Sequence, residues 1–243
     1  MHALLAGLTR AATAPVVLVG TIAVMWWLRG PADARNMIAG FVVWAFLSGG
    51  ILDRYARGRA TRARGFFAAC GAHFAAMLRL GLIVIGLNGA IHFALAARVG
   101  NASVMALALV LLSVVALVAV YGQIRLVVED RRSALGALLA GFRFIRRHPV
   151  SIGLFLIYAT AAWAASWTLG ALAPEAPVWW VADIAAVTLL AVVAFLLLAL
   201  YGSGIVLFQS RLAHAGYTAA PPLEWPESPA AEAIANASRS TAS

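Results

Sequence analysis

Residues 103–121 read SVMALALVLLSVVALVAVY, a run of 19 residues without a single charged side chain. A helix of about 20 apolar residues is long enough to cross the hydrocarbon core of a bilayer, which is about 30 Å thick. Shorter runs are also found in the cores of soluble proteins, but one of this length is typical of a membrane span. The run therefore predicts a transmembrane helix.

The whole chain has the same apolar character. Of its 243 residues, 63% are hydrophobic and 11% are charged, and the mean hydropathy is +0.92. Soluble domains average about 45–50% apolar and about 25% charged residues. A soluble domain of this size could not bury so much apolar surface, because most of its residues touch water. The composition therefore excludes a water-soluble protein.

Five more apolar runs lie on the two sides of the first. They cover residues 14–28, 37–52, 80–97, 150–172 and 178–208. The runs at 14–28 and 37–52 are short for a span, so they need flanking residues or local thinning of the bilayer to cross it. We expect an all-α integral membrane protein with six transmembrane helices.

Arginine is unevenly distributed between these runs. All 18 basic residues are arginine, against nine acids, which gives a net charge of +9. Cytoplasmic loops of membrane proteins carry the excess of positive charge. The arginines are concentrated after the second and fourth runs, at Arg54, Arg57, Arg59, Arg62, Arg64, Arg125, Arg131, Arg132, Arg143, Arg146 and Arg147. We therefore expect both termini and both arginine-rich loops to face the cytoplasm, and we expect no nucleic-acid partner.

Tryptophan gives an independent indication of the same orientation. Indole rings favour the membrane–water interface, where the ring is buried and the N–H stays hydrated. Five tryptophans lie near the expected outer ends of the runs, namely Trp26, Trp27, Trp167, Trp179 and Trp180. An alternative for the first run is a cleaved signal peptide, because residues 32–34 read ADA, a small-x-small site.

A short sequence recurs along the chain. Residues 3–8 read ALLAGL and residues 137–142 read ALLAGF, with Pro15 and Pro149 at the same distance beyond them. A weaker copy, FAACG at 67–71, precedes the third run, with Arg79 in place of the proline. We interpret these as three tandem units, each an interfacial amphipathic helix followed by a transmembrane hairpin. The expected membrane domain covers residues 1–215, with units at about 1–65, 66–130 and 131–215, before a disordered cytoplasmic tail at 216–243.

The copy before the fifth run has the pattern of an amphipathic helix. Its apolar residues recur at helical spacing, as Leu135, Leu138, Leu139, Phe142 and Ile145. Arginines border this stripe, so the helix is predicted to lie among lipid headgroups. The alternative is a cytoplasmic extension of a span, in which arginine only marks topology. The candidate residues for binding anionic headgroups are Arg54, Arg57, Arg62, Arg132, Arg143, Arg146 and Arg147.

Three polar residues within the runs form a candidate intramembrane site. Asn88 and His92 are four residues apart and share one face of a helix. Asp183 lies near the start of the sixth run. An Asp–His pair across the bundle would suit a proton or cation pathway. The alternative, which we favour, is that Asn88 and His92 bond to a neighbouring helix while Asp183 stays solvated at the outer interface.

Signatures of catalysis and of metal binding are missing from the sequence. There is no G-x-S-x-G or H-E-x-x-H motif, and a chain without lysine has no phosphate-binding P-loop. The single cysteine, Cys70, excludes an intramolecular disulfide and has no ligand partner at metal-binding spacing. We therefore expect no catalytic residues, no metal and no cofactor.

Residues 121–138, read as YGQIRLVVEDRRSALGAL and leading to FIRRHP at 144–149, carry a family resemblance. The segment resembles one shared by a loose group of bacterial multi-pass proteins, including the membrane domain of some glycerophosphoryl diester phosphodiesterases. The resemblance implies a bacterial inner-membrane protein in which Arg125 and Glu129 form a structural pair. No phosphodiesterase domain is present, so the resemblance carries no hydrolytic activity.

These observations favour a membrane protein that acts by interaction. Its expected partners are anionic membrane lipids, or another protein bound through the bundle or the tail, where Trp225 is the one anchor. The alternative function is a small-solute or ion transporter, which would need Asp183 and His92 to face a water-filled cavity.

Overall fold

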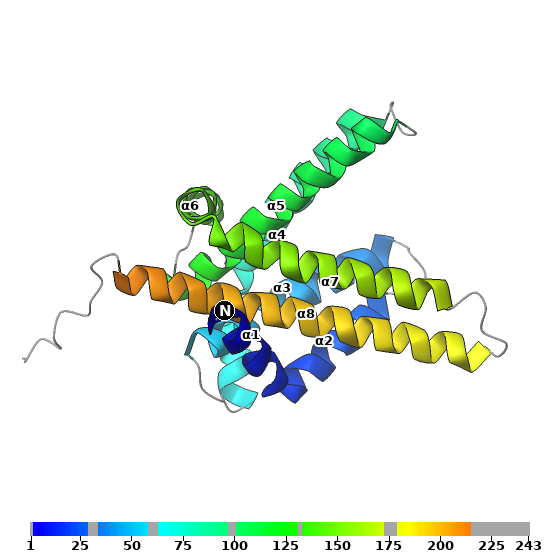
Figure 1. Ribbon diagram of the computed structural model, residues 1–243. Coiled ribbons are helices and arrows are strands. Elements are labelled where there is room, and N and C mark those ends of the chain that lie inside the picture. The colour runs from blue at the N-terminus through cyan, green and yellow to red at the C-terminus, as the bar shows by residue number, and fades with distance from the viewer. Residues whose placement is uncertain are drawn as a thin grey trace, which may run out of the picture. The chain divides into compact units, whose positions relative to one another are not determined.

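The computed structural model describes residues 2–28, 34–57, 63–96, 101–130, 133–172 and 179–214, and every structural statement below concerns these residues. Their regular structure is helical throughout, without strands. The chain divides into two compact units, Met1–Leu207 and Phe208–Ser243, and the contacts described here lie in the first. The helices in chain order are α1 (His2–Ala12), α2 (Pro15–Leu28), α3 (Ala34–Arg57), α4 (Ala63–Ala96), α5 (Ala102–Val128), α6 (Ala134–Arg147), α7 (Val150–Leu172) and α8 (Trp179–His214) (Figure 1).

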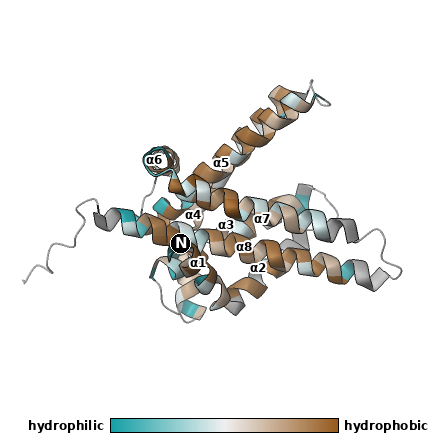
Figure 2. Cartoon of the chain, in the orientation of Figure 1, coloured by the Kyte–Doolittle hydropathy of each residue, from teal (hydrophilic) through white to brown (hydrophobic). Residues whose placement is uncertain are grey.

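Five of the described helices contain a segment long and apolar enough to cross a membrane. These segments are Arg35–Arg57, Ala63–Leu95, Ala102–Val128, Val150–Thr168 and Asp183–Arg211. A sixth would be added if His2–Ala12 and Val17–Ala23, which meet at a bend of 76°, formed one broken span. Figure 2 shows hydrophobic residues along most of the length of these helices. The prediction of an all-helical protein with several membrane spans is confirmed at this level.

The starts of three helices follow from local chemistry. Asn101 caps α5 by accepting a hydrogen bond at Oδ1 from the Ser103 backbone N–H (3.0 Å). The Ser133 Oγ accepts in the same way from the Gly136 N–H at the start of α6 (3.2 Å). Pro15 opens α2, where its missing N–H costs no intrahelical bond. Two capping side chains and one proline thus mark where these helices begin.

The second predicted unit differs from the other two. Its expected interfacial helix is not a separate element, because α4 runs without a break through 34 residues. Proline interrupts a helix by removing a backbone donor and by steric clash. Pro15 and Pro149 lie at the other two junctions, whereas α4 has Arg79 there. The prediction of three separate interfacial helices was therefore wrong for this unit.

The described core lies toward the ends of the spans that are predicted to be cytoplasmic. Large side chains that are fully buried there come from α3, α4, α5 and α8, and include Leu52, Leu80, Tyr121, Ile124 and Leu198. The opposite halves of α4 and α5, which pack against each other as a hairpin, are exposed. Their exposed large side chains are Leu82, Ile85, Leu87, Phe93, Met105, Leu107, Leu109, Val110, Leu111 and Val114. Such an apolar surface suits lipid, which is as apolar as leucine.

Candidate functional site

The amphipathic helix α6 packs one of its faces against α5. At the centre of the contact, a Cβ added to Gly141 would lie 2.9 Å from the Gly122 nitrogen and 3.2 Å from the Tyr121 carbonyl carbon. Phe144 of α6 adds a ring contact with Tyr121, with centroids 5.2 Å apart. The backbones of the two helices therefore touch at a site that only glycine fits.

The apolar residues of α6, predicted to form one stripe, are divided by the structure between a buried surface and an exposed surface. Leu138 and Ile145 are buried, at 8% and 7% exposure. Leu135, Leu139 and Phe142 are exposed, at 62%, 58% and 49%. A repeat of apolar residues does not tell a side chain packed on protein from one that faces lipid, because both environments are apolar. Only the latter three can meet the bilayer.

The residues that face away from α5 form what we call the exposed α6 face. Successive helical residues are rotated by about 100°, so Leu135, Leu139, Phe142 and Arg146 share one narrow arc. Arginines also lie along one side of this arc. The exposed α6 face consists of six exposed residues: Leu135, Leu139, Phe142, Arg143, Arg146 and Arg147. The face combines three large apolar side chains with three cations, which is the composition of a helix that lies in a membrane interface.

Arg125 holds α6 in this orientation. Its guanidinium donates to Glu129 Oε1 from Nη2 at 2.6 Å and from Nε at 2.9 Å. A third bond runs from Nη1 to the backbone oxygen of Ala140, in the middle of α6, at 2.9 Å. The Arg125 side chain is 19% exposed and the Glu129 side chain is 18% exposed, so the ion pair is largely shielded from solvent. One arginine thus joins the end of α5 to α6, and the bond to Ala140 has no signal in the sequence.

The other arginines predicted to bind headgroups have different surroundings. Arg57 donates from Nε to the buried carboxylate of Asp53 at 2.9 Å. Arg54 lines a cavity between α2, α3 and α4. Arg62 and Arg132 lie outside the described residues. The arginines of α6 are therefore the described candidates that combine exposure with adjacent apolar side chains.

Within the described residues, no interaction joins all three predicted intramembrane polar residues. His92 Nδ1 lies 2.8 Å from the Asn88 backbone oxygen, one turn earlier in α4. The Asn88 Oδ1 atom is buried without a hydrogen-bond partner, whereas His92 and Asp183 are exposed. Among the described residues, no bond or ion pair joins Asp183 to the other two. This geometry does not favour a shared proton or cation site.

Polar contacts between α5, α7 and α8 were not predicted. The Tyr201 hydroxyl donates to Gln123 Oε1 at 2.6 Å, and the Tyr158 and Ser203 hydroxyls are 2.8 Å apart. The described part of the chain contains no group of three metal-ligating side chains. The two hydrogen bonds are consistent with packing between these helices.

Of the predicted tryptophans at the outer interface, Trp167 is 65% exposed. The side chains of Trp26, Trp27, Trp179 and Trp180 lie outside the described residues, as does the tail at 216–243.

Comparisons with known proteins gave no match: no family model fits the chain, and no curated protein or solved structure was found to be similar.

Proposed function

We propose that this chain is a multi-pass protein of the bacterial inner membrane that acts without catalysis, by binding anionic lipid at the cytoplasmic surface. The observation that carries the proposal is the exposed α6 face, where three arginines border three exposed apolar side chains. The apolar side chains enter the boundary between headgroups and acyl chains, and the guanidinium groups meet phosphate. Arginine suits this role because its planar fork binds phosphate through two parallel hydrogen bonds.

The packing of α6 strengthens this binding. An isolated amphipathic peptide loses conformational entropy when it folds on a membrane, and this loss weakens its binding. Here α6 is already folded, packed on α5 through Gly141 and bonded to Arg125. Preorganised groups bind more tightly because the cost of ordering them has been met by the fold. Each basic residue near an anionic surface contributes about 1 kcal/mol.

Neutralising the arginines of α6 tests the proposal. We expect the triple variant Arg143→Gln, Arg146→Gln, Arg147→Gln to retain less phosphatidylglycerol than the wild type when purified from the same membranes. One arginine near the surface corresponds to a factor of about five in affinity, so the triple loss should exceed fivefold. Native mass spectrometry of the protein with its bound lipids measures this retention.

The matched control replaces the same three arginines by lysine, which keeps the charge and should keep most of the lipid. Equal phosphatidylglycerol retention by the glutamine variant and the wild type would contradict the proposal. A stoichiometric protein that purifies with the wild type, and is lost with the glutamine variant, would instead assign the face to a membrane assembly.

The proposal requires six spans with both termini inside, and this topology is tested by cysteine labelling. Cys70 is the single cysteine of the chain, so a Cys70→Ala variant provides a background without cysteine. New cysteines can then be introduced and labelled one at a time. We expect Pro31→Cys, Gly100→Cys and Glu175→Cys to react with an impermeant maleimide applied to intact cells, and Ser133→Cys and Ser240→Cys to stay unlabelled. Labelling at residue 133 would place α6 outside. No labelling at residue 31 would mean that the runs at 14–28 and 37–52 do not cross the membrane as a hairpin.

A further inference from the structure

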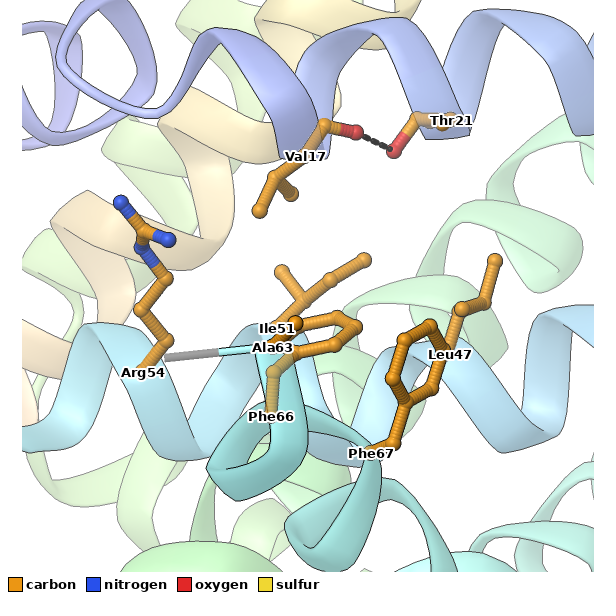
Figure 3. Close-up of a pocket in the computed structure, with 9 residues that line it drawn as sticks. Val17, Thr21, Leu47, Ile51, Arg54, Ala63, Phe66 and Phe67 are labelled. Atoms are coloured by element: carbon orange, nitrogen blue, oxygen red, sulfur yellow. Dashed lines mark hydrogen bonds between the residues drawn. The ribbon is translucent and has the colours of Figure 1, made fainter. Parts of the chain in front are cut away.

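A cavity of about 370 Å³ lies between α2, α3 and α4 (Figure 3). Its lining residues come from one stretch of each helix: Val17, Gly20, Thr21, Leu47, Ile51, Arg54, Ala63, Phe66 and Phe67. In Figure 3 the side chains of Leu47, Ile51, Phe66 and Phe67 border the space on one side, and Val17 and Thr21 border it on the other. The volume falls within the range of about 300–1,000 Å³ that is typical of small-molecule sites.

The lining is apolar apart from Arg54 and the hydroxyl of Thr21. That hydroxyl donates to the Val17 backbone oxygen at 2.8 Å, within α2, so its hydrogen-bonding capacity as a donor is used. An apolar space of this kind does not hold water stably, because water needs several polar partners. The cavity therefore suits a hydrocarbon group.

Arg54 is the cation at one end of this space (Figure 3). The carboxylate of the preceding residue, Asp53, is already bonded to Arg57 at 2.9 Å. Across the described ranges, the Arg54 guanidinium has no carboxylate or hydrogen-bond acceptor as a partner. A half-buried cation next to an apolar cavity is electrostatically complementary to an anion that carries a hydrocarbon chain.

We propose that this cavity binds one acyl chain of an anionic phospholipid, with the lipid phosphate beside Arg54. The inference rests on the proposed function in that lipid is the partner, but it names a separate site and a single bound molecule. An acyl chain gains little by leaving the bilayer for another apolar site, since lipid tails are as apolar as leucine. Phosphatidylcholine also carries a phosphate, so selectivity for an anionic lipid must come from the attraction between Arg54 and the net negative charge of the headgroup, and retention from the shape of the cavity.

Gly20 offers a way to fill the cavity without disturbing the helices. A Cβ added at Gly20 meets no heavy atom within 4 Å, so a larger side chain can extend into the open space. The same is true of Gly153 in α7, which is not among the cavity residues. The pair Gly20→Leu and Gly153→Leu therefore changes the same residue type in the same way, inside and outside the cavity.

Photo-crosslinking tests the proposal in the full-length protein. The protein is placed in nanodiscs of equal phosphatidylglycerol and phosphatidylcholine, with a trace of either lipid carrying a diazirine on its acyl chain. We expect the phosphatidylglycerol probe to crosslink to Leu47, Ile51 and Phe66, as mapped by peptide mass spectrometry. Gly20→Leu should remove most of these crosslinks, and Gly153→Leu should keep them.

Arg54→Gln provides a second readout that does not depend on filling the space. The preference of the cavity crosslinks for phosphatidylglycerol over phosphatidylcholine should fall about fivefold, as expected for one arginine at an anionic surface. The thermal unfolding temperature of each variant shows that it is folded. Cavity crosslinks unchanged by Gly20→Leu, or equal for both probes in the wild type, would overturn the proposal.

This experiment is independent of the test of α6. Loss of phosphatidylglycerol from the α6 glutamine variant, without crosslinks in the wild-type cavity, would leave the proposed function intact and refute the cavity site. Cavity crosslinks together with full lipid retention by the α6 glutamine variant would refute the exposed α6 face and support the cavity alone.

Discussion

Replacing Gly141 by valine should destabilise the protein by about 3 kcal/mol, the upper end of the usual cost of overpacking. The new Cβ would lie 2.9 Å from the Gly122 nitrogen and 3.3 Å from the Val118 oxygen. These are backbone atoms of a helix, which cannot rotate away as a side chain can. The whole of α6 must therefore move off α5. Urea unfolding followed by near-ultraviolet circular dichroism, with the protein in nanodiscs, measures the change.

Gly71→Val is the matched control for this substitution. Gly71 is aligned with Gly141 in the predicted repeat, but a Cβ added there meets no heavy atom within 4 Å. The control should change stability by no more than about 0.5 kcal/mol, as is usual for surface substitutions. Equal effects of the two substitutions would contradict the close approach of α6 to α5.

Replacing Arg125 by alanine should destabilise the protein by about 2–3 kcal/mol, because it removes a donor shared by two partly buried acceptors. The Glu129 carboxylate and the Ala140 oxygen each lose their bond to the guanidinium. We also expect α6 to become accessible to limited proteolysis, since the bond to Ala140 joins it to α5. Urea unfolding and the cleavage rate within α6 give the two measurements.

Two further variants separate the role of the Arg125 fork from that of its charge. Arg125→Lys keeps the charge but cannot reproduce the geometry of three bonds, so it should recover only part of the lost stability. Arg143→Ala removes an exposed arginine from α6 and should be neutral for folding to within about 0.5 kcal/mol. If Arg125→Ala were no less stable than Arg143→Ala, the link between α5 and α6 would not hold α6 in place.

The sequence was most informative about the spans and less so about where helices end. The apolar run 103–121 lies within α5, but the helix continues to Val128 and includes Arg125. Hydropathy marks the part of a helix that sits in hydrocarbon, whereas the helix itself is stable beyond the bilayer wherever it packs on protein. For the same reason the run 80–97 gave no sign that α4 begins at Ala63.

The candidate site was predicted in composition but not in arrangement. The periodicity of α6 showed that it is amphipathic, yet it could not assign Leu138 to protein and Leu139 to the exposed side. The spacing of Arg125 and Glu129 suggested their pairing, but the bond to Ala140 depends on how two helices cross. The cavity at Arg54 is lined by residues of three helices, so it depends on how these helices pack and could not be predicted from any one stretch of sequence.

The internal repeat stays a prediction. Gly7 and Gly141, at the same position in two copies, both lie against backbone atoms of another helix: Gly7 against the Ala199 oxygen and the Ser203 nitrogen, and Gly141 against the Gly122 nitrogen. Gly71, in the second unit, has open space instead. Small residues that permit close helix approach are common in membrane proteins, so packing alone can select them.

The depth of α6 in the membrane is the property on which the proposed function depends. Spin labels on Leu139→Cys and Arg147→Cys, each in the Cys70→Ala background and in phosphatidylglycerol-containing nanodiscs, report this depth through collisions with oxygen and with a water-soluble nickel complex. We predict that the label at residue 139 is accessible to oxygen and shielded from nickel, about 5–10 Å below the surface, while that at 147 meets nickel. Equal nickel access at both positions would place the exposed α6 face in water and contradict its role in lipid binding.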